Sequence, residues 1–263
     1  MDKRFSLGVH VSSLRLPLKQ ALHTVANLGA DAVEIDARST LRPEELTQTG
    51  ARHLRKILED LNLRTAALTF VTQRGFHDEE ELERRIQAAQ RTLQTAYRLG
   101  ARWVVTNLGN IPGEEDQSRW NLLREVLLDL GRYGHHVGAM LAAETGQDDG
   151  TVLARLVESL PEGTLWVAFN PGRLLMHGFN ARTALERLAR HVQYVYATDA
   201  VRDPHRGSGL AVPLGRGVAD FPAILGTLEE FQYRGYITVL CENATDPVSE
   251  VRTALEYLRN VAQ

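Results

Sequence analysis

Short apolar runs alternate with longer segments of helical spacing along the whole chain. The apolar runs predict eight strands, at 5–11, 32–36, 64–70, 102–108, 138–144, 165–170, 192–198 and 236–242. After each run, apolar residues recur every three or four positions, which predicts an amphipathic helix. One such stripe consists of Leu82, Ile86, Ala89, Leu93, Ala96 and Leu99.

Strands that alternate with helices favour a parallel sheet. Eight strand–helix units in 263 residues match the size of a (β/α)8 barrel. We therefore predict an α/β protein, a single (β/α)8 TIM barrel domain over residues 1–263. The alternative, an open doubly wound sheet, is disfavoured because no G-x-G-x-x-G follows the first strand. The one irregular crossover, 200–220, is rich in glycine and proline and predicts a long functional loop.

The composition excludes several kinds of partner. The formal net charge is −3, so we expect no nucleic-acid partner. No apolar run is long enough for a signal peptide or a membrane span, so we expect no membrane partner. The single cysteine, Cys241, excludes an internal disulfide and fits a reducing, cytoplasmic location. Whether the barrel pairs into a homodimer stays open.

Polar residues at the predicted strand ends are the candidates for a site, because barrels of this kind carry their chemistry there. They are His10, Glu34, Asp36, Thr69, Asn107, Glu144, Asn170, Tyr196, Asp199 and Glu242. Glu144 is the strongest, since it ends a buried strand, where a carboxylate needs a partner or a function. His10 has an ordinary alternative as a structural histidine, and Asn107 has one as a turn cap.

Arginines lie near the expected mouth of the barrel, where they would meet a phosphate or carboxylate of a ligand. They are Arg173, Arg202, Arg206 and Arg216. Solvation of a loop, or ordinary ion pairing, is the alternative explanation for them.

Five segments carry a family resemblance through their order and spacing. They are LGADAVEIDAR, LAAETG, FNPGRLLMHGFNARTAL, YVYATDAVRD and VPLGRGVADFPAILGTLEEFQYRGYITVLCEN. Together they resemble the sugar phosphate isomerase/epimerase family, the xylose isomerase-like TIM barrels. The resemblance implies a divalent Mn, Mg, Zn or Co ion held by two glutamates, an aspartate and a histidine. In epimerase members the glutamates exchange the proton α to a carbonyl that the metal polarises.

The implied ligand set departs from the family pattern at three of its four positions. Glu144 retains the first glutamate. Asn170 stands at the aspartate, Tyr196 at the histidine and Leu240 at the second glutamate. An amide and a phenol are poor ligands for these ions, and leucine offers no donor. We therefore expect no metal cofactor at the family position.

A displaced metal site is the alternative. Glu242 lies two residues beyond Leu240 and shares its face if the strand continues. Such a site would combine Glu144 and Glu242 with Asp199 and with His10 or His205. Only in that case do we expect a divalent ion.

Two functions remain open. The first is an isomerase or epimerase that acts on a small sugar or polyol derivative, and the second is a catalytically inactive relative that binds a sugar-like ligand or a protein partner. The candidate catalytic residues are Glu144 and Glu242, and the candidate substrate-binding residues are His10, Asn107, Asn170, Arg173, Tyr196, Asp199, Arg202 and His205. A DNA-repair endonuclease on the same barrel is disfavoured, because the strand ends lack the histidine and carboxylate density of a multi-metal cluster.

Overall fold

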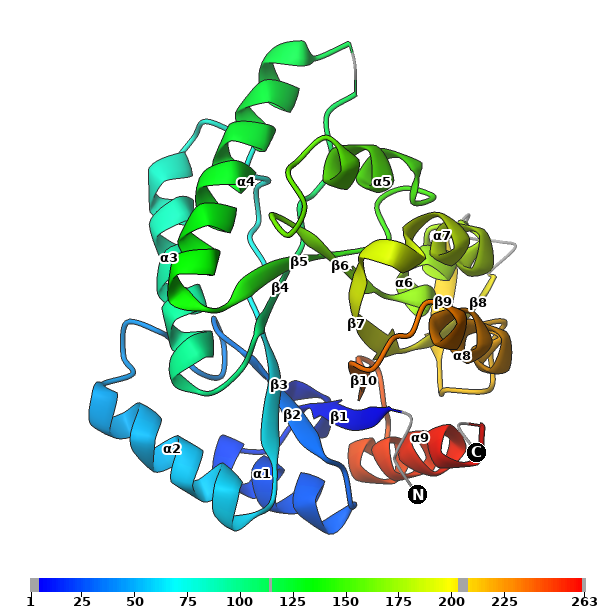
Figure 1. Ribbon diagram of the computed structural model, residues 1–263. Helices are drawn as coiled ribbons and strands as arrows, with labels where there is room; N and C mark the ends of the chain where they lie inside the picture. Colours follow the sequence, from blue (N-terminus) through cyan, green and yellow to red (C-terminus); the bar gives the residue numbers. More distant parts are fainter. Residues whose placement is uncertain (1–4, 114, 203–207, 262–263) are drawn as a thin grey trace.

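The computed structural model describes residues 5–113, 115–202 and 208–261. Within these residues, eight parallel strands close into a barrel in which each strand pairs with the next and the last pairs with the first (Figure 1). They are β1 (Ser6–His10), β2 (Ala32–Asp36), β3 (Arg64–Thr69), β4 (Trp103–Thr106), β5 (Met140–Glu144), β6 (Trp166–Phe169), β7 (Val192–Ala197) and β10 (Tyr236–Val239). The predicted (β/α)8 fold is confirmed, and all eight predicted strands are present.

Helices connect the strands and surround the barrel (Figure 1). They are α1 (Leu18–Asn27), α2 (Gln48–Asp60), α3 (Leu82–Arg98), α4 (Gln117–Val137), α5 (Thr151–Glu158), α7 (Ala181–Leu188), α8 (Phe221–Glu230) and α9 (Pro247–Val261). A short helix, α6 (Pro171–Met176), follows β6 directly, and 3₁₀ turns occupy Val11–Leu14 and Ala189–His191. In the described part of the chain, no helix is both long and apolar enough to cross a membrane.

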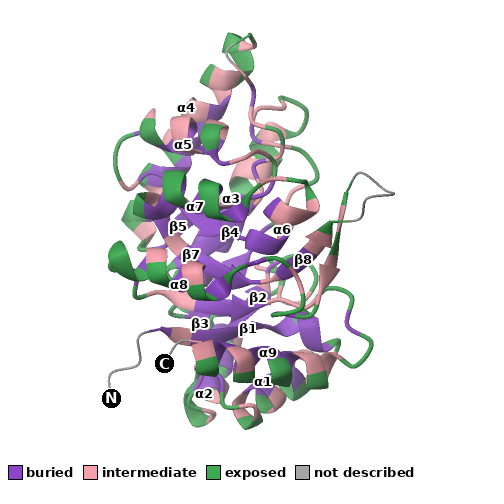
Figure 2. Ribbon diagram, turned by 90° about the vertical axis from the view of Figure 1, so that its right-hand side faces the viewer, coloured by how far each residue is buried: buried purple, intermediate pink, exposed green. Residues whose placement is uncertain are grey.

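Buried hydrophobic residues form two clusters. Figure 2 shows that the barrel strands are largely buried, while the outer surfaces of the helices are exposed. The larger cluster lies between strands and helices, and the smaller one lies inside the barrel. In the smaller cluster, alanines such as Ala67 and Ala142 leave room for the rings of Trp103, Tyr194 and Tyr196. The two tyrosine rings pack edge to face, with centroids 5.4 Å apart. The barrel is therefore packed through its centre, and the space for a ligand lies at its mouth.

The last barrel strand is shorter than the sequence pattern predicts. We expected a strand over 236–242, but β10 ends at Val239. The main-chain N–H of Cys241 donates to Oγ of Ser13 at 3.0 Å, so it is not available for a ladder hydrogen bond. Leu240 and Glu242 therefore lie on the segment after the strand.

The crossover at 200–220 is more regular than predicted. Strands β8 (Asp199–Arg202) and β9 (Gly209–Val212) form an antiparallel pair outside the barrel. Gly209 permits this pairing against α6, because a Cβ there would lie 2.8 Å from Cα of Met176. The predicted loop is thus in part a hairpin that packs on α6.

Candidate functional site

A cavity of about 390 Å³ opens at the carboxyl ends of the barrel strands. Its lining residues are His10, Ser12, Asp36, Thr69, Val71, Glu144, Arg173, Tyr196, Leu240, Cys241 and Glu242. Five of the predicted catalytic and substrate-binding residues therefore share one cavity, although the chain separates the first, His10, from the last, Glu242, by more than two hundred positions. A smaller hollow beside it is lined in part by Asn170, Asp199 and Glu250.

Glu144 is held at the end of β5 by two side-chain donors. Nδ2 of Asn170 donates to its Oε1 at 2.7 Å, and Nη1 of Arg173 donates to its Oε2 at 2.8 Å. The Glu144 side chain is only 6% exposed. Burial raises the pKa of Glu144, and the neighbouring Arg173 guanidinium opposes that rise without cancelling it.

The geometry of α6 explains why Arg173 reaches this carboxylate. Asn170 caps the helix, since its Oδ1 accepts from the main-chain N–H of Arg173 at 3.0 Å, and Pro171 occupies the first turn. Gly146 leaves space for the arginine, because a Cβ there would lie 2.4 Å from Cγ of Arg173. The opening stretch of α6 thus delivers both donors of Glu144.

Arg173 also lies between two carboxylates. Its Nη2 is 3.5 Å from Oε1 of Glu242, which is 45% exposed at the rim of the cavity. Glu144, Arg173 and Glu242 therefore form a row that runs from the barrel interior to solvent.

A second buried carboxylate lies deeper in the barrel. Glu34 is fully buried, and it accepts hydrogen bonds from Thr69, from Tyr194 at 2.9 Å and from Tyr196 at 2.6 Å. Burial is the largest cause that raises the pKa of both tyrosines well above its usual value, and the charge of Glu34 adds to it. Both phenols are therefore protonated donors to Glu34 at neutral pH.

Hydrogen bonds connect this carboxylate to the cavity. Because Thr69 uses its hydroxyl hydrogen on Glu34, it accepts from Nε2–H of His10, at 3.1 Å. Nδ1 of His10 is then 2.7 Å from Oγ of Ser12. Ser12, His10 and Thr69 thus form a continuous row of hydrogen bonds from the cavity to Glu34.

The comparisons with known proteins agree with this architecture. A family model described as the xylose isomerase-like TIM barrel matches residues 22–261. The chain belongs to this family. An inosose dehydratase from Clostridium beijerinckii is 25% identical over 246 residues, which cover 78% of this chain and 79% of that protein.

Solved structures show the same xylose isomerase-like fold. A xylose isomerase domain protein from Planctomyces limnophilus superposes with a TM-score of 0.85 at 22% identity, over 98% of this chain and 97% of that one. The IOLI protein, solved with a zinc atom, gives a TM-score of 0.82 at 18% identity, over 98% of both chains. At these identities the likeness establishes the fold alone.

The positions that carry the metal in the resemblance are otherwise engaged in this member of the family. The Tyr196 hydroxyl donates to Glu34. The Asn170 Oδ1 accepts from Arg173 and from Oγ1 of Thr198, the latter at 2.6 Å. Leu240 lines the cavity without a donor atom. Among the residues that the structure describes, no group of three or more His, Cys, Asp or Glu side chains is arranged to hold a metal ion.

Other predicted site residues lie outside the main cavity. Oδ1 of Asn107 accepts from the main-chain N–H of Gly109 at 2.6 Å, which is the turn-capping arrangement. Arg202 is exposed on β8. His205 lies outside the described residues. Their ligand-binding roles stay predictions.

The carboxylate of Asp199 is held by main-chain hydrogen bonds. Its two oxygens accept four main-chain N–H groups, from Ala200, Gly215, Gly217 and Ala219. It thereby fixes the segment that follows β9, and it borders only the smaller hollow. Its substrate-binding role also stays a prediction.

Sequence reasoning did not single out Ser12, Tyr194 and Thr238 as members of the hydrogen-bond network around Glu34 and His10. Thr238 Oγ1 lies 2.6 Å from the Tyr194 hydroxyl. One signal was available, because residues two apart on a strand point to the same face and Tyr194 therefore accompanies Tyr196 into the barrel.

Proposed function

We propose that the cavity binds a small polyol or keto-sugar and that Glu144 exchanges a proton with it, without a divalent ion at the family position. The observation that carries this proposal is the position of Arg173 between Glu144 and Glu242, at 2.8 and 3.5 Å. A side-chain cation thus lies between Glu144 and Glu242, whereas the resemblance implies a metal ion between two glutamates.

The residues at the family's metal position do not fit a divalent ion. A hard dication gives up its waters only for several anionic oxygens or imidazoles. Here Glu144 is one carboxylate and is already paired with Arg173, while Asn170 uses its oxygen as a helix cap. No step of the proposed chemistry passes through a metal.

Glu144 has the properties of a base for a carbon acid. Its raised pKa brings it closer to the range in which a carboxylate accepts and returns a proton. A carboxylate has about four lone-pair positions, and Asn170 and Arg173 use two of them. In the proposed reaction Glu144 removes the proton α to the substrate's carbonyl, and Arg173 stabilises the enolate oxygen that forms.

The likeness to the inosose dehydratase supports a polyhydroxylated ketone as the substrate class. Protonation of the enolate carbon on its other face, by solvent water, would give an epimer. Return of the proton from Glu144 to the neighbouring carbon, after the enediol is formed, would give an isomer. Loss of a β-hydroxyl from the same enolate, as water once Glu144 has given it the proton, would give dehydration. All three reactions begin with the same proton transfer to Glu144.

A second candidate function is ligand binding without turnover. It is favoured by the engagement of both Glu144 oxygens, because Arg173 and Asn170 make Glu144 a weaker base than the same buried carboxylate would be without these two donors. In this case the cavity would still recognise hydroxyl groups through Arg173 and His10.

Proton exchange in heavy water separates the two candidates. Chelator-treated protein is incubated in D₂O with an inosose or with fructose, and deuterium at carbon is followed by NMR. We expect exchange α to the ketone that persists in chelator and is lost in Glu144→Gln. Glu125→Gln on the exposed face of α4 removes the same charge and serves as the control.

Binding of the ketone without exchange would favour the second candidate. Exchange that chelator abolishes and a divalent ion restores would refute the metal-free reaction. Exchange that is unchanged in Glu144→Gln would refute the role of Glu144.

A further inference from the structure

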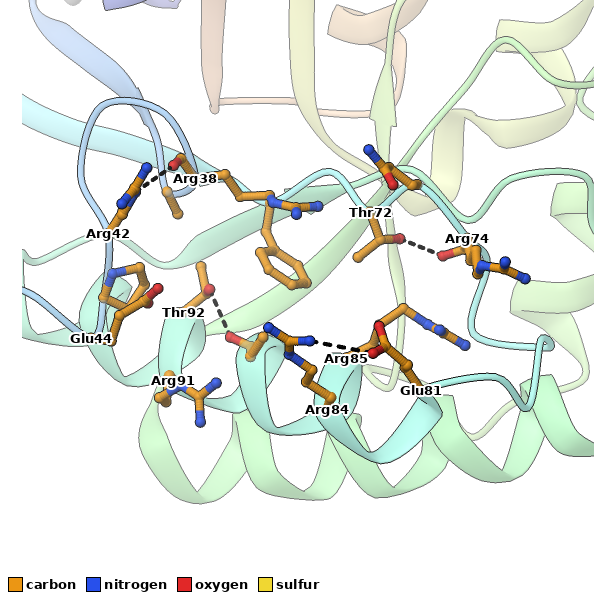
Figure 3. Close-up of a pocket in the computed structure, with 15 residues that line it drawn as sticks. Arg38, Arg42, Glu44, Thr72, Arg74, Glu81, Arg84, Arg85, Arg91 and Thr92 are labelled. Carbon is orange, nitrogen blue, oxygen red and sulfur yellow. Dashed lines mark hydrogen bonds and ion pairs between the residues drawn. The ribbon is translucent and has the colours of Figure 1, made fainter.

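A second and larger cavity, of about 480 Å³, lies away from the barrel mouth, between the segment after β2 and the start of α3 (Figure 3). Six arginines line it: Arg38, Arg42, Arg74, Arg84, Arg85 and Arg91. The lining carboxylates are Glu44 and Glu81. The lining of this cavity thus carries more positive than negative side chains, although the net charge of the whole chain is −3.

Three of the six arginines are paired with nearby carboxylates on the surface. The pairs join Arg42 to Glu45, Arg74 to Asp78 and Glu80, and Arg84 to Glu81, at 2.8–3.3 Å. These pairs are solvent-exposed, so they hold the side chains only weakly.

The other three arginines, Arg38, Arg85 and Arg91, form no ion pair with a carboxylate among the described residues. Arg38 donates to the main-chain oxygen of Val71 at 2.7 Å. Arg85 donates from its terminal nitrogens to main-chain oxygens, which carry no net charge, and its buried Nε has no acceptor among the described residues. Arg91, on the exposed face of α3, forms no ion pair within the described part of the chain.

The arginines face the cavity from two sides. In Figure 3, Arg38 and Arg42 come from the segment after β2, and Arg84, Arg85 and Arg91 come from α3 below them. A volume of this size accommodates a small molecule rather than a single oxyanion. Guanidinium groups recognise phosphate oxygens with paired N–H donors and keep their charge at any physiological pH.

We propose that this arginine cavity binds a small molecule that carries two phosphate groups, one against the β2 segment and one against α3. The cavity shares no lining residue with the mouth. Neighbouring residues after β3 divide between the two: Thr69 and Val71 line the mouth, and Phe70 and Thr72 line the arginine cavity. This site is independent of the proposed reaction at Glu144.

Isothermal titration at constant ionic strength tests the proposal on the intact protein. The probes are inorganic pyrophosphate, fructose 1,6-bisphosphate and inorganic orthophosphate. We expect saturable binding of one or both of the first two, at least tenfold tighter than orthophosphate. Tighter binding of the bisphosphorylated sugar identifies an organic ligand, and tighter binding of pyrophosphate identifies the inorganic ion.

Substitutions on the two sides of the cavity test whether the phosphate probes bind there. Arg42→Gln and Arg91→Gln should each weaken binding about tenfold, because each removes charge-assisted hydrogen bonds to one phosphate. Arg98→Gln is the matched control, since Arg98 lies seven residues beyond Arg91 on the same helix, is exposed and does not line the cavity. It should change the affinity less than twofold.

The proposal is overturned if neither pyrophosphate nor fructose 1,6-bisphosphate shows saturable binding. It is also overturned if Arg91→Gln and Arg98→Gln weaken binding equally, or if orthophosphate binds as tightly as pyrophosphate. Unchanged thermal unfolding of the variants shows that the affinities compare folded proteins.

Discussion

Arg173, in the first turn of α6, and Asn170, the residue that caps this helix, both donate to the carboxylate of Glu144. The distances are 2.8 Å for Arg173 and 2.7 Å for Asn170. One helical turn therefore supplies both the charge that compensates Glu144 and the amide that orients it. The proposed function depends on this pair, and the first prediction follows from it.

Replacement of Arg173 by Gln should destabilise the protein by about 1–3 kcal/mol at pH 7, because it leaves a buried carboxylate without its cation. The figure is below the range for fully buried pairs, since the Arg173 side chain is 23% exposed. Denaturant unfolding measures the change. Arg182→Gln, at an exposed ion pair on α7, should cost under about 1 kcal/mol.

The same variant should have a distinctive pH dependence. Arg173 lowers the pKa of Glu144, so its loss raises that pKa further. When the pKa of a carboxyl group is higher in the folded than in the unfolded state, the protein becomes less stable as pH rises from the unfolded-state pKa to the folded-state pKa. The destabilisation by Arg173→Gln should therefore shrink as pH falls through the raised folded-state pKa of Glu144, first in the variant and then in the wild type, toward the unfolded value of about 4.3. A cost that is constant from pH 4 to pH 8 would contradict this account of the pair.

Tyr196 should be a structural donor to Glu34. Tyr196→Phe removes one hydrogen bond to a buried charge and should cost about 1.5–3 kcal/mol of unfolding free energy. Tyr97→Phe is the control, because Tyr97 is 59% exposed. In a Glu34→Gln background the cost of Tyr196→Phe should fall by about half or more, as expected for groups in one network. Equal costs in both backgrounds would show that Tyr196 does not act through Glu34.

Cys241 should react slowly although it lines the mouth. Burial is the largest cause that raises the pKa of its thiol, to about 12, and the neighbouring Glu250 adds to the rise. The thiolate is the reactive form, so alkylation by iodoacetamide at pH 8 should be at least about a hundredfold slower than for the unfolded chain. Mass spectrometry measures this at the chain's single cysteine.

Glu250→Gln should accelerate that alkylation, because it removes a negative charge beside the thiol. Glu256→Gln, on the exposed face of the same helix, is the control for the loss of charge. If the folded wild-type protein reacted as fast as the unfolded chain, the claim that burial raises the pKa of the Cys241 thiol would be contradicted.

Restoration of the family's ligands should create a metal site only if Arg173 is also removed. The variant combines Asn170→Asp, Tyr196→His and Leu240→Glu, with and without Arg173→Ala. We expect the fourfold variant to bind Mn²⁺ or Zn²⁺ more tightly than the threefold one, because the guanidinium otherwise competes for Glu144. Calorimetric titration with each ion measures this, and equal affinities would contradict the proposed role of Arg173.

The sequence was sufficient for the barrel and for the neighbourhood of Glu144. Periodicity identified the strands, and the rule that sites lie at strand ends brought His10, Glu144 and Tyr196 together. These are consequences of local pattern and general topology.

The contacts inside the barrel could not be predicted in the same way. Tyr194 and Glu34 are 160 positions apart, and their meeting depends on the stagger of β2 and β7, which are separated in the barrel by β1 and β10. The β8–β9 hairpin was missed because its glycine- and proline-rich sequence is typical of a loop, while its pairing depends on packing against α6. The sequence placed Arg173 at the mouth of the barrel. It could not show that Arg173 lies between Glu144 and Glu242, because this depends on the direction in which α6 leaves β6.

The metal content of the protein purified without chelator tests the central claim most directly. The account predicts well under one equivalent of Mn, Zn, Mg or Co per chain by elemental analysis, and no change in Glu144→Gln. One equivalent of a divalent metal in the wild type, lost in Glu144→Gln, would contradict it.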